Sequence, residues 1–203
     1  SIGRNAFVGC SSLTSVEIPN SVTSIENGAF GGCTSLKELR IESGTKTLKL
    51  GYNYYSTNGL GEGLFYDCPL ETLYLGRDLS YNNTEAYGYS PFFNKNSITS
   101  VTIGNNVTKI NSKAFSGCYS ITNIHLLGMT PPKVDANNFI ESQYIDITIY
   151  VPTGALKKYQ KFAIWEKFWD IREEDVTEKP EEEVKMCATP LITYNNSGLD
   201  IAS

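Results

Sequence analysis

The sequence has one histidine, two tryptophans and a charged fraction of only 19%. The lone His125 would have to be the base of any Ser/His/Asp or Cys/His catalytic set, and no nucleophile is marked beside it. No apolar run approaches the roughly 18 residues of a membrane-spanning helix, so membrane attachment would need an anchor outside this chain. With a net charge of −5 and no basic stripe, the chain also lacks the surface that binds nucleic acid.

Other chemical signatures are weak or missing. Gly59, Gly61 and Gly63 form a glycine-rich stretch, but no Lys-Ser/Thr pair follows it as in a phosphate-binding loop. The carboxylates are scattered, and no Cys-x-x-Cys or Cys/His spacing predicts a metal site. We therefore expect no enzyme activity, no catalytic residues, no cofactor and no bound metal.

An internal repeat dominates the chain. The first two copies read IGRNAFVGCSSLTSVEI and IENGAFGGCTSLKELRI, and every equivalent position is offset by 23 residues. The equivalent pairs are Ile2 and Ile25, Ala6 and Ala29, Phe7 and Phe30, Cys10 and Cys33, Leu13 and Leu36, Val16 and Leu39, and Ile18 and Ile41. Such a period is the sequence signature of a solenoid.

Later copies keep this register around insertions. They centre on Phe65 with Cys68, on Phe92-Phe93, and on Phe115 with Cys118, and a degenerate last copy runs through Phe139 and Val151. In the fourth copy Asn96 stands where a cysteine is expected. The copies together predict a β-rich repeat solenoid of about six coils.

Each copy contains one alternating segment and one shorter extended piece. In LTSVEI, Val16 and Ile18 point to one side and Glu17 to the other, which is typical of a half-buried strand. VTSI and VTKI are examples of the second piece. One coil cannot bury its apolar side alone, but coils stacked about 4.8 Å apart form a continuous core.

The pattern IxxxAFxGCxSLTxVxIPxSVTxI resembles the leucine-rich repeats of the BspA-like surface-protein family, found in Bacteroides-type bacteria and some protozoa. The resemblance covers residues 1–152, and YVPTGALKKYQKFAIWEKFWDI is similar to the terminal segment of many of these proteins. It implies a right-handed leucine-rich-repeat stack, export to an extracellular or cell-surface location, and adhesion or ligand recognition.

The carboxyl-terminal part is expected to divide into three segments. Residues 153–172 are predicted to form a helix that caps the open end of the stack, with Thr153 as N-cap. Residues 173–186 read as an acidic linker, and residues 187–203 as the start of a further β domain. Because the chain begins partway through a repeat, we also expect repeat sequence upstream.

Two insertions lengthen the interval between strands to 34 residues (Ile41 to Leu75) and 28 residues (Leu75 to Ile103). They carry six tyrosines among Asn, Ser and Gly: Tyr52, Tyr54, Tyr55, Tyr81, Tyr87 and Tyr89. Tyrosine offers a rigid apolar face with a polar tip, which suits recognition loops. The alternative is that these tyrosines pack against the flank of the solenoid.

The repeat also places equivalent side chains in columns. Cys10, Cys33, Cys68 and Cys118 share one position and are expected to be free, buried thiols, whereas Cys187 lies outside this column. The outward column of the main strands is Glu17, Arg40, Tyr74, Thr102, His125 and Tyr150.

From this column we select Arg40, Tyr74, His125 and Tyr150 as candidate binding residues, together with the six insertion tyrosines. The favoured hypothesis is a non-enzymatic adhesion module that binds a host extracellular protein or a glycan. The alternatives are a solvated strand face that contacts nothing and a structural spacer within a larger surface protein.

Overall fold

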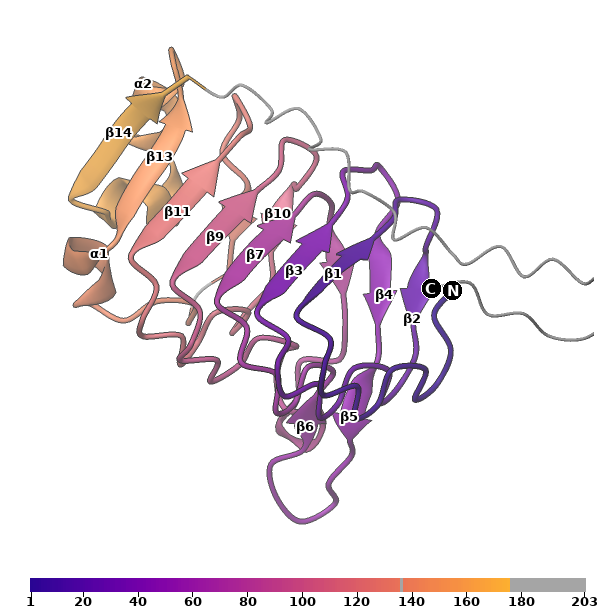
Figure 1. Ribbon diagram of the computed structural model, residues 1–203. Coiled ribbons are helices and arrows are strands. Elements are labelled where there is room, and N and C mark those ends of the chain that lie inside the picture. Colours follow the sequence, from indigo (N-terminus) through magenta and orange to yellow (C-terminus); the bar gives the residue numbers. More distant parts are fainter. Residues whose placement is uncertain (136, 176–203) are drawn as a thin grey trace, which may run out of the picture.

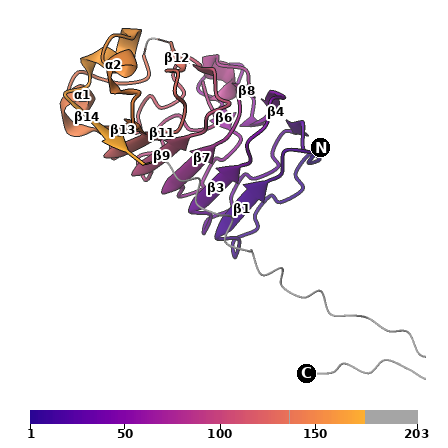
Figure 2. The same cartoon turned by 90° about the horizontal axis from the view of Figure 1, so that it is seen from above.

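The structure, a computed structural model, describes residues 1–135 and 137–175. Its coils stack along one axis, with β1 (Ser15–Ile18) near one end and β14 (Asp170–Glu174) at the other (Figures 1 and 2). The predicted β-solenoid is confirmed, and its strands pair in parallel from coil to coil.

The largest sheet contains seven strands in the order β1-β3-β7-β9-β11-β13-β14. Besides β1 and β14 these are β3 (Glu38–Ile41), β7 (Thr72–Leu75), β9 (Ser100–Ile103), β11 (Asn123–Leu126) and β13 (Thr148–Pro152). The register pairs Glu17 with Arg40, Arg40 with Tyr74, and so on through Tyr150 and Arg172. The outward column expected from the repeat is therefore the observed one.

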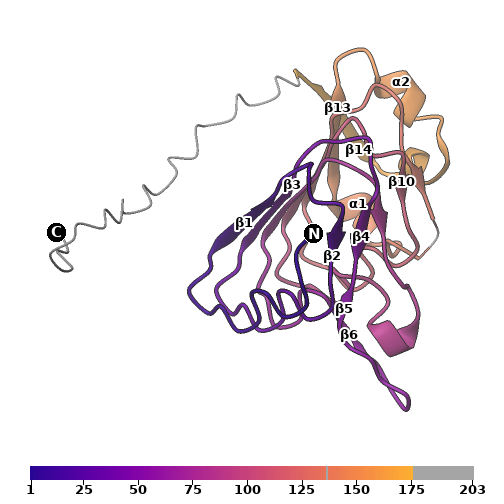
Figure 3. The same cartoon turned by 90° about the vertical axis from the view of Figure 1, so that its right-hand side faces the viewer.

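Shorter strands form the other side of the coils (Figure 3). β2 (Ser24–Ile25), β4 (Leu48–Leu50) and β8 (Leu79–Ser80) make a three-stranded sheet, and β10 (Lys109–Ile110) pairs with β12 (Lys133–Val134). The first insertion adds an antiparallel hairpin of β5 (Tyr52–Tyr54) and β6 (Glu62–Gly63), and the second a 3-10 helix, η1 (Glu85–Tyr87).

A column of phenylalanine rings, one from each of six coils, runs through the core. The members of this ring column are Phe7, Phe30, Phe65, Phe92, Phe115 and Phe139. Neighbouring ring centroids lie 5.2 to 6.3 Å apart, and the planes deviate from parallel by at most 23°. The column explains why each copy of the repeat keeps a Phe.

The cysteine column lies beside the rings, and its four members in the described residues are free. The buried thiols of Cys33, Cys68 and Cys118 each donate to a carbonyl of the preceding coil, at 3.1, 3.0 and 3.0 Å. Burial raises the pKa of Cys33, and it raises those of Cys68 and Cys118 to about 12. The expectation of burial is wrong for Cys10, which is exposed because no coil covers its outer side in the described structure.

The expected capping helix over 153–172 is also wrong. The segment forms one helical turn, α2 (Leu156–Tyr159), a 3-10 helix, η2 (Ala163–Lys167), and then β14. Thr153 is not the N-cap: α2 begins after Ala155, and the Thr153 hydroxyl donates to Asp175 at 2.8 Å. Glu173 and Glu174, assigned to the linker, pair with β13 instead.

Burial of three aromatic side chains explains why the helix breaks. Three aromatic side chains are buried at this end of the stack: Tyr159, Trp165 and Phe168. The ring centroid of Phe168 lies 5.3 Å from that of Phe139, the last ring of the column. In a continuous helix, nine residues make two and a half turns, so Tyr159 and Phe168 would face opposite sides. Ala163, the first residue of η2, has a left-handed φ of 40°, so the helical path of α2 does not continue into η2 and both rings can be buried.

One further short helix, α1 (Gln143–Asp146), precedes β13. The remainder of the predicted linker and the predicted β segment, residues 176–203 including Cys187, lie outside the described residues.

Candidate functional site

The strand face is the outward side of the large sheet, formed by Glu17, Arg40, Tyr74, Thr102, His125, Tyr150 and Arg172. Beside it runs a second column of Ser15, Glu38, Thr72, Ser100, Asn123, Thr148 and Asp170. All of these side chains are exposed or half-buried. Four of the ten candidate residues, Arg40, Tyr74, His125 and Tyr150, therefore share one solvent-facing surface.

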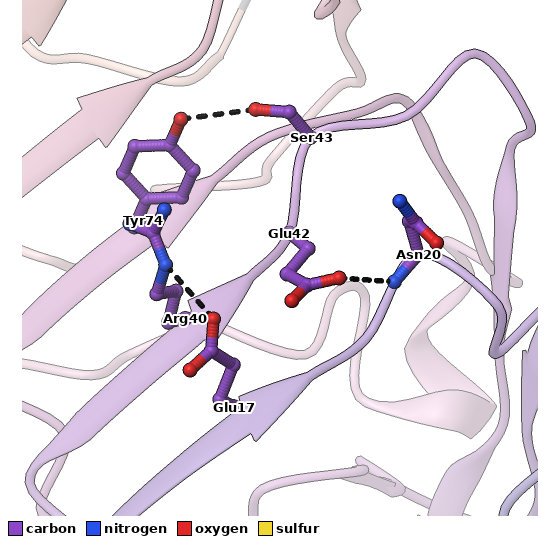
Figure 4. A network of polar contacts seen from close by, with 6 residues as sticks. All are labelled: Glu17, Asn20, Arg40, Glu42, Ser43 and Tyr74. Carbon is purple, nitrogen blue, oxygen red and sulfur yellow. Dashed lines mark hydrogen bonds and ion pairs between the residues drawn. The ribbon is translucent and has the colours of Figure 1, made fainter. Parts of the chain in front are cut away.

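A polar cluster occupies the β1, β3 and β7 end of the strand face (Figure 4). Arg40 Nε donates to Glu17 Oε1 at 3.1 Å, and the Arg40 guanidinium carbon lies 4.0 Å from the centroid of the Tyr74 ring. The Tyr74 hydroxyl shares a 3.0 Å hydrogen bond with Ser43, in the turn after β3. The Tyr74 ring is thus held at its face by a cation and at its tip by a hydroxyl.

A second cluster lies at the β11, β13 and β14 end. The rings of His125 and Tyr150 stack with centroids 4.6 Å apart and planes 8° from parallel. His125 Nδ1 lies 2.7 Å from Glu174 Oε1. Next to it Arg172 forms a two-pronged ion pair with Asp170, at 2.6 and 2.9 Å, and this hydrogen bonding lowers the pKa of Asp170.

The six insertion tyrosines do not form one site. Tyr87 of η1 contacts Tyr52 and Tyr55 of the hairpin segment, with centroids 4.7 and 5.0 Å apart. Backbone bonds from Ser56 to Ala86 and from Gly61 to Glu85 join the two insertions. Tyr54 and Tyr55 remain more than two-fifths exposed.

The other two tyrosines follow the alternative interpretation, packing onto the solenoid. Tyr81 packs against the core, and burial raises its pKa. Tyr89 is half-buried against Phe93 at 4.7 Å, with the Lys113 ammonium 3.5 Å from its ring centroid.

The hairpin projects from the solenoid on a different side from the strand face (Figure 3). In the chain, the hairpin continues from β4 of the three-stranded sheet, not from the large sheet. The strand face and the exposed Tyr54 and Tyr55 are consequently separate surfaces, and a single small ligand cannot contact both.

Sequence reasoning missed Arg172, Asp170 and Glu174, which β14 adds to the strand face. The alternation in DIREE is the signal that could have extended the columns by one strand. In the part of the chain that the structure describes, no three His, Cys, Asp or Glu side chains gather as a metal site. No helix there is long and apolar enough to cross a bilayer.

Comparison with known proteins agrees with the stacked architecture. The family description of the BspA type leucine rich repeat region matches residues 1–126 and 88–164, in six copies. No curated protein matches the chain significantly. Repeats of this family are generally non-catalytic, are typical of surface proteins and typically form binding modules. The matched residues, the parallel seven-stranded sheet and the ring column show that this chain belongs to the BspA-type leucine-rich repeat family.

Proposed function

We propose that this solenoid is a non-enzymatic, extracellular recognition module that binds a host protein or a glycan chain through the strand face. The carrying observation is the exposed stripe that runs across all seven strands, with aromatic and arginine side chains positioned at both ends. Tyr and Arg are enriched among residues that dominate binding energy.

The spacing of the two clusters restricts the ligand. Tyr74 and Tyr150 are three strands apart, which at about 4.8 Å per strand places their backbones about 14 Å apart. A ligand that engages both must therefore be an extended glycan or a protein surface, not a single sugar or metabolite.

The area of the strand face also restricts the kind of ligand. Seven strands of about four residues cover roughly 29 Å by 13 Å, about half of the ~800 Å² that one partner contributes to a standard protein interface. A protein ligand would have to contact the bordering turns as well, such as the turn of Glu42 and Ser43 beside Tyr74.

The internal pairing of the strand face favours a second candidate function. Arg40 is bonded to Glu17 and Arg172 to Asp170, so these charges are already compensated without a ligand. A spacer that holds a distal domain away from a surface needs a stable, solvated face of this kind.

A binding screen separates the two functions. Chain 1–203 is tested against immobilised extracellular matrix proteins and a glycan array, alongside a Tyr74→Ala/Tyr150→Ala variant. Saturable binding that the variant loses, with its folding intact by circular dichroism, supports recognition through the strand face. No binding to any member would contradict the proposal and leave the spacer function.

A further inference from the structure

The turn that follows each ring of the ring column normally joins neighbouring coils by a backbone hydrogen bond. The backbone N–H groups of Gly9, Gly32 and Asn94 donate to the carbonyls of Gly31, Tyr66 and Ser116, at 2.8, 2.9 and 2.9 Å respectively. The equivalent groups between the third and fourth coils are the Asp67 N–H and the Phe93 carbonyl. They are not bonded to each other, and neither has a hydrogen-bond partner among the described residues.

The fifth and sixth coils are joined by a side chain beside the equivalent gap. There the equivalent bond, from the Gly117 N–H to the Ile140 carbonyl, is also absent: that carbonyl accepts from the Gln143 N–H at 3.0 Å, and the buried Gln143 side chain joins the two coils through neighbouring groups. Its Nε2 donates to the Cys118 carbonyl at 3.0 Å, and its Oε1 accepts from the Ile140 N–H at 3.2 Å. Between the third and fourth coils the Ser97 hydroxyl donates to the Leu70 carbonyl at 2.7 Å beside the gap, but among the described residues no side chain bonds to the Asp67 N–H or to the Phe93 carbonyl.

A cavity of about 450 Å³ lies at that gap. The turns of residues 66–69 and 93–97 line it, and residues 60–63 together with Gly88, Ser90 and Pro91 complete its wall. Its volume falls within the roughly 300–1,000 Å³ of small-molecule sites. The insertions thus create a concave site that a regular coil would not have.

Lys95 supplies the positive charge in this cavity. Its N–H bonds to the Phe92 carbonyl at 3.2 Å, as the N–H of Cys33 and Cys68 bond to the carbonyls of Phe30 and Phe65. Lys95, and not Asn96, therefore occupies the cysteine position of the fourth coil. Its ammonium has no hydrogen-bond or ion-pair partner among the described residues, and burial lowers its pKa.

The lining offers donors and acceptors in one small space. The Lys95 ammonium and the Asp67 N–H can donate, while the Phe93 carbonyl and the Asp67 carboxylate can accept. Tyr66, which is 41% exposed, adds aromatic surface to the wall. An apolar ligand would leave the Lys95 charge unpaired, and a strong anion would meet the carboxylates of Asp67 and Glu62.

Molecules with several hydroxyl groups both donate and accept, and a pyranose ring adds an apolar C–H face that packs on aromatic rings. We propose that the cavity between the third and fourth coils is a binding site for a single neutral sugar unit. This site is separate from the strand face and does not depend on the function proposed for that face.

The test uses chain 1–203 and a panel of methyl glycosides: neutral hexoses, N-acetylhexosamines, a uronic acid and a sulfated hexose. Saturation-transfer NMR detects binding, and amide shifts in ¹H–¹⁵N spectra locate it. We expect at least one neutral sugar to bind and to shift the amides of Gly61 and Asp67.

The variant Lys95→Cys restores the residue that the repeat itself uses, so it is expected to fold while losing the ammonium. Lys95→Cys and Tyr66→Ala should each weaken sugar binding about tenfold or more. Lys46→Met, which removes an exposed lysine outside the cavity, and Tyr74→Ala on the strand face should have no effect.

Three results would overturn the assignment. They are a panel without any binder, a sugar whose affinity is unchanged in either Lys95→Cys or Tyr66→Ala, and a response only to the uronic acid or sulfated hexose. The last result would show an anion site. Loss of protein or glycan binding in strand-face variants leaves this proposal unaffected, because it is tested with single sugars and with substitutions in the cavity itself.

Discussion

The Arg40 guanidinium carbon lies 4.0 Å from the Tyr74 ring centroid, on a strand face that is open to solvent. Exposed cation–π and ion pairs contribute little to stability, so Arg40→Ala and Tyr74→Ala should each lower the free energy of unfolding by less than about 1 kcal/mol. Urea denaturation of each variant measures this. A loss of several kcal/mol would mean that these side chains are structural and not available for recognition.

The ring column is expected to carry much more of the stability. Phe30 is fully buried and Phe115 is 1% exposed, so replacing either with alanine should cost about 3–5 kcal/mol. Phe7→Ala is the matched control, since this ring belongs to the same column but is 39% exposed, and its cost should be clearly smaller. Equal costs at Phe7 and Phe30, or unchanged unfolding of either buried variant, would contradict the assignment.

Thiol reactivity tests the cysteine column. At pH 8 a thiol of pKa about 12 is ionised to roughly one part in ten thousand, so Cys68 and Cys118 should resist alkylation, whereas the exposed Cys10 should react. The test uses the Cys187→Ser variant, and mass spectrometry counts the labels. We expect iodoacetamide to add one label to the native protein and four labels to the protein unfolded in urea, one at each remaining cysteine. Rapid labelling of Cys68 in the native protein would show that the column is not closed.

The lowered pKa of Lys95 should make the free energy of unfolding depend on pH. Because its pKa is lowered by burial, the folded protein binds this proton less tightly than the unfolded chain does. The protonated Lys95 therefore lowers the free energy of unfolding. This loss disappears as the pH rises from the lowered pKa of the folded protein to the ordinary value of 10.5.

The Lys95→Met variant has no ammonium at this position. The thiols and tyrosines, which also titrate near pH 10, are the same in the variant and the wild-type chain, so their contributions cancel in the comparison. The stability advantage of Lys95→Met over the wild-type chain should be largest at pH 7 and should shrink toward pH 10, in urea titrations at both pH values. A difference that does not change with pH would contradict burial of the ammonium.

The sequence alone predicted the parts of the molecule that repeat. Alternation within each copy and the offset between copies determined which residues pair, so Tyr74, His125 and Tyr150 were placed correctly on the strand face. This works because the side-chain period of a strand is two residues and each strand is paired with its equivalent in the next coil.

The parts that do not repeat were harder to predict. Tyr87 contacts Tyr52 and Tyr55 only because two insertions that are far apart in the sequence fold against each other, and no local pattern encodes that contact. Helical spacing suggested one capping helix, but burying both Tyr159 and Phe168 required a break. The cysteine position of the fourth copy was assigned to Asn96 instead of Lys95, because this copy has two adjacent phenylalanines, Phe92 and Phe93, and no cysteine to fix the register.

The most direct test of the central claim is the affinity of the Tyr74→Ala/Tyr150→Ala variant for the ligand found in the screen, measured by surface plasmon resonance. Tyr54→Ala/Tyr119→Ala is the control, because it removes two exposed tyrosines outside the strand face. We predict that the strand-face variant binds about tenfold more weakly or worse and the control binds normally. Unchanged affinity in the strand-face variant would contradict recognition through the strand face.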